Sequence, residues 1–218
     1  MLTYHIKVIP EGNMMRLVYL TELAVLMALL LLAPAVALAY PSEYQFRTRE
    51  TEHFRITYHQ GEEELVDYVT VLIEDIHANL SPILDWKPEQ KTEILLVDHT
   101  DSSNGFTNVY PYNRIVFYMV PPGQNNALND YDDWLRLLIS HEYTHILQLD
   151  TKGGLVAVID KIFGKTLNPN QQTPRWYSEG SAVWSESRLT GGGRNRSSIF
   201  EMYLRANFLE NRDLDISE

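Results

Sequence analysis

Residues 137–150, LLISHEYTHILQLD, carry the pattern on which the interpretation of the chain depends. His141 and His145 are four residues apart, so on a helix both imidazoles lie on one face and can bind one ion. Glu142 follows the first histidine, where it can take a proton from a water at the metal without being a ligand. Apolar residues flank the pattern, which favours a buried helix over a chance match on a solvated one. The expected cofactor is one catalytic Zn2+ ion.

A second segment, PRWYSEGSA at residues 174–182, makes the interpretation more specific. HEYTH followed by a helix with W-x-x-E-G-x-A resembles the gluzincin peptidases, the clan of thermolysin and the alanyl aminopeptidases. The match extends to Trp176, Glu179, Gly180 and Ala182. The resemblance implies that Glu179 is the third protein ligand, and the alternative is an ordinary first-turn acid. The small residues Gly180 and Ala182 would let this helix approach the first one closely.

The wider stretch HEYTHILQLD, PRWYSEGSAVWSES and GGRNRSS resembles the peptidase MA-like domain of exported bacterial proteins. In many of these the domain precedes a TolB-like β-propeller. The likeness covers most of residues 40–218 and implies an α+β, thermolysin-like fold, with a small mixed sheet packed on the HExxH helix and a helical lobe. The insert between HEYTH and Glu179 is longer than in the alanyl aminopeptidases. No propeller repeats are present, so we expect the domain to be C-terminally truncated and the propeller to occur in longer relatives.

The activity implied by the resemblance is zinc-dependent hydrolysis of peptide bonds in a peptide or protein substrate, with Glu142 as the catalytic base. No G-x-M-E-N segment is present, which favours an endopeptidase. Glu186 follows Glu179 by seven residues on the same helical face, and the resemblance implies that an acid here hydrogen-bonds a ligand imidazole from outside; the alternative is a solvent-facing acid. Tyr203 is the one candidate for an oxyanion donor. The residues that bind substrate stay open. The alternative function is a catalytically weak or inactive binding or scaffold module of the cell envelope that keeps the protease fold.

Hydrophobic periodicity gives the remaining elements. Strands are expected at residues 52–58, 92–97 and 114–120, and helices at 62–80, 132–153, 155–163, 176–188 and 199–209. Residues 102–113 are expected to be a loop, and Pro82 is expected to end the first helix. The strand at residues 115–120 is either an edge strand that binds substrate or a core strand. Strands that precede helices favour an α+β arrangement.

Composition limits the other function classes. The formal net charge of -11 disfavours nucleic acid as a partner. The chain has no cysteine, so a zinc site must use histidine and carboxylate ligands. Four further histidines show no ligand spacing and are expected to be ordinary surface or core residues; they are His53, His59, His77 and His99. The oligomeric state stays open.

The first 39 residues resemble a secretory signal peptide. Lys7 and Arg16 precede an uncharged apolar run at residues 23–33, which is followed by Pro34 and the small-x-small sequence that ends at Ala39. The run is short for a membrane span, so cleavage near Ala39 is favoured over a retained anchor. We therefore expect an exported protein of the bacterial periplasm or cell envelope.

Overall fold

The computed structural model describes residues 19–23, 25, 43–101, 103–122, 133–210 and 212. The chain divides into two compact units, Met1–Glu43 and Tyr44–Glu218. In the first unit residues 19–23 are helical, and the rest of the expected signal peptide, with its cleavage site at Ala39, lies outside the described residues. Among the described helices, none has both the length and the apolar character needed to cross a membrane.

Five strands of the second unit form one mixed sheet in the order β1-β2-β3-β5-β4. They are β1 (Phe46–Glu50), β2 (Phe54–His59), β3 (Thr92–Val97), β4 (Asn104–Asn108) and β5 (Arg114–Tyr118). The three central strands run parallel, and β1 and β4 are antiparallel edge strands. A mixed sheet built mainly before the helices agrees with the expected α+β class.

The helices of this unit are α2 (Glu63–Leu84), α3 (Trp134–Leu149), α4 (Gly154–Phe163), α5 (Arg175–Leu189) and α6 (Ser198–Leu209), with short 3-10 turns η1 (Pro169–Gln172) and η2 (Arg194–Arg196). Helix α2 makes the crossover between the parallel strands β2 and β3. The expectation that Pro82 ends this helix is wrong. Pro82 lies inside the last turns of α2, which ends at Asp85 in the left-handed conformation, φ 51°.

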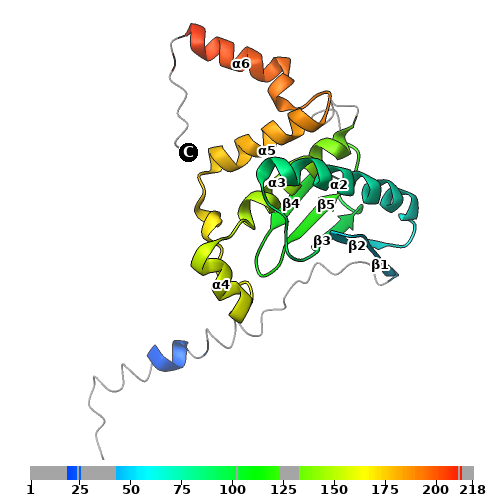
Figure 1. Ribbon diagram of the computed structural model, residues 1–218, viewed down its shortest axis with the longest axis vertical. Helices are drawn as coiled ribbons and strands as arrows, with labels where there is room; N and C mark the ends of the chain where they lie inside the picture. The colour runs from blue at the N-terminus through cyan, green and yellow to red at the C-terminus, as the bar shows by residue number, and fades with distance from the viewer. Residues whose placement is uncertain are drawn as a thin grey trace, which may run out of the picture. The chain divides into compact units, whose positions relative to one another are not determined.

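One face of the sheet carries the core. Alternate residues of the parallel strands are fully buried on that face: Phe54, Ile56, Ile94, Leu96, Ile115 and Phe117. They pack in one cluster with apolar residues of α2 and α3, which lie beside each other in Figure 1. The residues between them, such as Thr57, Leu95 and Val116, stay half-buried on the other face. This alternation is the pattern of a sheet that is covered by helices on one side.

Two strands differ from the sequence-based expectation. Residues 102–113 are not a loop throughout, because β4 lies within them, and β1 was not expected at all. Both are short, polar edge strands, for which hydrophobic periodicity gives little signal. Strand β5 lies between β3 and β4. The prediction that residues 115–120 form an edge strand is therefore wrong, and the alternative, a core strand, is confirmed for β5. The edge strand beside α3 is β4.

Candidate metal centre

Helix α3 holds the motif in a buried position. Its N-terminus is capped by Asp133, whose carboxylate accepts a hydrogen bond from the backbone N–H of Arg136 at 3.0 Å. The helix packs against α2, α5 and β4, so that side chains all round it are buried. His141 is 8% exposed and Glu142 is 7% exposed. The motif therefore lies away from bulk water, where electrostatic interactions are strong.

Three side chains from α3 and α5 converge on one point. The Nε2 atoms of His141 and His145 are 3.3 Å apart, and Glu179 Oε2 is 3.4 Å from the first and 3.9 Å from the second. Ligand atoms about 2.0–2.2 Å from a tetrahedral zinc ion would be roughly 3.3–3.5 Å apart. Two imidazole lone pairs at this separation repel each other unless a cation or a proton lies between them. The set therefore fits a zinc ion with three protein ligands.

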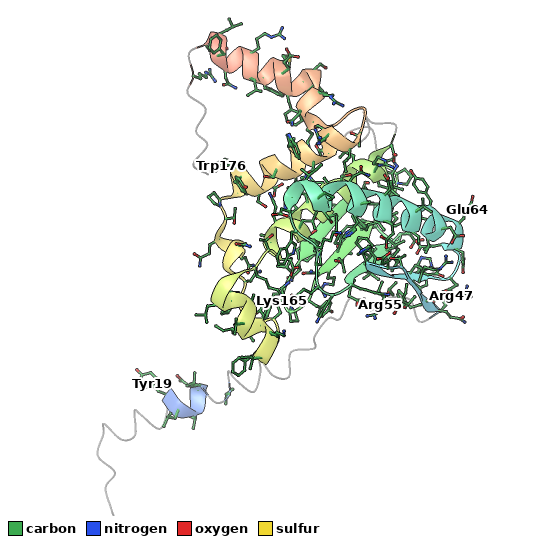
Figure 2. All side chains as sticks on the ribbon, viewed as in Figure 1. Tyr19, Arg47, Arg55, Glu64, Lys165 and Trp176 are labelled. Carbon is green, nitrogen blue, oxygen red and sulfur yellow. The ribbon has the colours of Figure 1, made fainter. Side chains whose placement is uncertain are left out.

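Helix α5 brings Glu179 to α3. Ala182 is fully buried in this contact, which agrees with the expected close approach of the two helices. Gly180 does not contribute to it, because a Cβ atom there would meet nothing within 4 Å. Trp176, at the start of α5 in Figure 2, is 52% exposed and does not pack in the core. Of the two small residues in the pattern, Ala182 is therefore buried and Gly180 is exposed.

His145 is held in its neutral form. Burial, with a contribution from the neighbouring charge of His141, lowers the pKa of His145 to about 4. Its Nδ1 atom lies 3.1 Å from the hydroxyl of Ser178, next to Glu179 on α5. A neutral imidazole with one nitrogen occupied by a hydroxyl and the other facing His141 is a suitable metal ligand.

His141 is supported from outside by Glu186, as the sequence suggested. Glu186 is fully buried on α5, and its Oε2 lies 3.3 Å from His141 Nδ1. Burial alone would raise the pKa of Glu186, but hydrogen bonds from His141 and Arg194 outweigh it and the pKa is lowered. The ionised carboxylate can accept the Nδ1 proton, which leaves Nε2 free for a metal.

Arg194 contacts Glu186 and His141, a position that the sequence did not indicate. Its guanidinium donates to Glu186 from Nε at 2.8 Å and from Nη2 at 3.0 Å, and its backbone N–H donates to the same carboxylate. Nη2 also lies 2.8 Å from His141 Nδ1. Because arginine only donates, that contact suits the opposite imidazole tautomer. The paired contacts with Arg194 hold the Glu186 carboxylate beside His141, 3.3 Å from its Nδ1 atom.

A glycine allows this arginine to reach the site. Gly193 has φ +90°, and a Cβ there would lie 2.5 Å from the Cα of Ser187 on α5. The chain therefore folds back against α5 more closely than a side chain would permit. This return places η2, which begins with Arg194, over Glu186. The Gly191-Gly192-Gly193 run was the available sequence signal for it.

Glu142 faces the edge strand β4. Thr107 donates to Glu142 Oε2 at 2.6 Å and to its backbone oxygen at 3.1 Å. A Cβ atom on Gly105 would lie 2.5 Å from Glu142 Cγ, so the strand and the carboxylate are in close contact. Burial raises the pKa of Glu142, and the hydrogen bond from Thr107 opposes that rise. A carboxyl group with a raised pKa beside a candidate metal site is suited to general base and acid chemistry.

Tyr203 lies on α6 and is 60% exposed. With Phe200 and Leu204 it lines a surface pocket of about 500 Å³, which Arg194 also lines. Its assignment as an oxyanion donor therefore stays a prediction.

The described part of the chain contains a second group of this kind, His59 with Glu62 and Asp98. Both groups combine histidine and carboxylate ligands that could hold a metal ion. Comparison with known proteins adds no assignment: no protein-family model matches the chain, and no significant match occurs among curated proteins.

Proposed function

We propose that this protein is a zinc-dependent peptidase of the gluzincin type, with endopeptidase specificity. The observation that carries the proposal is the meeting of His141, His145 and Glu179 at distances suited to one zinc ion, next to the buried carboxylate of Glu142. Three protein ligands leave one position of a tetrahedral ion for water or substrate, as catalytic zinc sites require.

Three residues of the chain would have separate roles in this reaction. A bound zinc ion supplies Lewis acidity, which makes water a nucleophile near neutral pH. Glu142 accepts the proton of that water at a carboxylate oxygen and later delivers it to the leaving amine. Thr107 holds Glu142 through Oε2, which fixes the orientation of the base. Glu186 holds His141 in the tautomer that keeps Nε2 for the metal.

Strand β4 is the proposed position of the substrate backbone. It is the edge of the sheet nearest α3, and an edge strand offers unpaired backbone groups to an extended peptide. Gly105 brings this strand into close contact with Glu142. A peptide paired along β4 would therefore pass beside the proposed base.

We also propose that the protein is exported. The N-terminal sequence of the secreted protein should then begin near Tyr40.

The test is Glu142→Gln, which keeps the shape of the side chain but cannot accept the proton. We expect it to lower the rate of peptide cleavage by about 100- to 10,000-fold and to leave zinc content unchanged, because Glu142 is not a ligand. Glu64→Gln, an exposed change on α2, is the matched control. A Glu142→Gln variant that cleaves at the parent rate contradicts the role. Zinc binding without cleavage by the parent supports the alternative, a scaffold module that keeps the site.

A further inference from the structure

A second cluster lies at the carboxyl ends of the parallel strands β2 and β3. His59 is the last residue of β2, and Asp98 follows the last residue of β3. These strands are parallel neighbours, so their carboxyl ends meet at one edge of the sheet. Glu62 precedes the first residue of α2, the crossover helix that starts just beyond β2. Topology therefore brings together three potential ligands that come from three successive elements.

The geometry requires a positive charge between these groups. The His59 Nδ1 atom lies 2.8 Å from the backbone oxygen of Gln60, to which it donates, so the lone pair belongs to Nε2 in the neutral ring. That Nε2 lies 2.7 Å from Asp98 Oδ1 and 3.7 Å from Glu62 Oε1. A lone pair facing two carboxylates is repulsive. Either a proton or a metal ion must therefore lie at Nε2.

Glu62 distinguishes the proton from the metal. Its side chain is 7% exposed, and neither carboxylate oxygen makes a hydrogen bond of ordinary length and angle with any of the described residues. A protonated His59 Nε2 could donate a hydrogen bond to Asp98 Oδ1, which lies 2.7 Å away. It could not donate one to Glu62 Oε1, which lies 3.7 Å away and is too far for a hydrogen bond. A buried carboxylate left without partners is costly. A divalent cation would satisfy His59 and both carboxylates together.

We propose that His59, Glu62 and Asp98 form a second metal site, for a divalent transition metal of the zinc class. One imidazole with carboxylates suits zinc, whereas calcium takes oxygen ligands alone. The ring of Tyr44 stacks on the His59 ring at 4.4 Å and shields it on one side. Asp98 is 38% exposed and has room to adjust its oxygen around an ion. Such an ion would link β2, α2 and β3. The proposal of this site does not depend on the proposed peptidase activity.

The experiment isolates the second site by removing the first. In a His141→Ala/His145→Ala background of the full chain, zinc binding is measured by equilibrium dialysis with elemental analysis. Thermal unfolding is followed with and without zinc, because a ligand of the folded state raises the melting temperature. We expect one zinc ion per chain and a zinc-dependent rise in melting temperature. Circular dichroism checks that each variant is folded.

Glu62→Gln and Asp98→Asn, each made in that background, should weaken this binding by more than about 100-fold, the upper range for losing an outer partner alone. Glu64→Gln is the matched control. It lies two residues from Glu62 on the exposed side of α2, as labelled in Figure 2, and should bind zinc like the background. A folded background protein that binds no zinc overturns the proposal. Zinc binding that both ligand variants leave unchanged also overturns it.

Discussion

The two histidine and carboxylate clusters of this protein are assembled in different ways. In the α3 cluster, which consists of His141, His145 and Glu179, the two histidines are four residues apart on one helix and the carboxylate comes from the helix packed on it. In the sheet-end cluster, His59, Glu62 and Asp98 come from the ends of two parallel strands and the start of their crossover helix. Local spacing therefore reveals the first cluster, whereas the second depends on which strands are neighbours.

The outer contacts of the two clusters differ as well. His141 faces Glu186, a buried side chain whose position depends on Arg194 and on the close return of the chain at Gly193. His59 donates to the backbone oxygen of Gln60, the next residue in the chain. In the α3 cluster, the orientation of the His141 ring thus depends on residues that are distant in the sequence. In the sheet-end cluster, the His59 ring donates its hydrogen bond to the backbone of the next residue.

The largest effect among the following variants is expected from Gly105→Ala, which disturbs the proposed base beside the α3 cluster and leaves the sheet-end cluster untouched. The new Cβ would lie 2.5 Å from Glu142 Cγ and force the carboxylate out of place. Displacement of a catalytic group by about 1 Å can cost roughly 100-fold in rate. We expect a loss of that order in peptide cleavage, with zinc content unchanged at both clusters. Gly153→Ala is the control, because a Cβ there meets nothing within 4 Å. Equal rates for the two variants would contradict the placement of Glu142 against β4.

Glu186→Gln should affect the two proposed metal sites differently. Gln keeps the size of the side chain but loses the charge that pairs with Arg194 and accepts from His141. Loss of such an outer partner typically lowers metal affinity by about 10- to 100-fold. We expect this loss at the α3 cluster and no change at the sheet-end cluster, measured by competition with a zinc chelator. Weakening of both sites by the same factor would show a global effect on the fold.

Gly193→Ala tests the backbone approach that places Arg194. The change adds a Cβ against the Ser187 backbone and places alanine at φ +90°, which should cost about 1–3 kcal/mol of unfolding free energy. Gly191→Ala is the matched control in the same loop, where a Cβ meets nothing. Denaturant unfolding measures both. If the two variants are equally stable, the close return of the chain at Gly193 is wrong.

The smallest effect is expected from Asp98→Asn in metal-free protein. Asp98 is partly exposed, and exposed ion pairs contribute about 0–1 kcal/mol. We therefore expect little change in stability without metal and a clear loss of the zinc-dependent stabilisation. Thermal unfolding in chelator and in zinc gives both values. A large loss of stability in chelator would show that the contact with His59 is a structural ion pair.

The sequence predicts those parts of the candidate site that lie within one helix. His141 and His145 follow from their spacing, and Glu186 follows from its position seven residues after Glu179. Thr107 and Gly105 could not be predicted, because their role depends on β4 pairing at the edge of the sheet beside α3.

The same limit explains the other omissions. Arg194 reaches Glu186 because the chain turns back against α5 at Gly193. Nothing in the sequence around Arg194 indicates that Glu186 is its partner. The proposed role of His59 rests on Asp98, which is far from it in the sequence. Only the parallel pairing of β2 with β3 brings these two residues together.

The most direct test of the central claim is a crystal structure of the zinc-loaded protein, with anomalous diffraction data collected at the zinc absorption edge. The account predicts an anomalous peak about 2.0–2.2 Å from the Nε2 atoms of His141 and His145 and from a carboxylate oxygen of Glu179. Zinc-loaded crystals without a peak between these three side chains would contradict it.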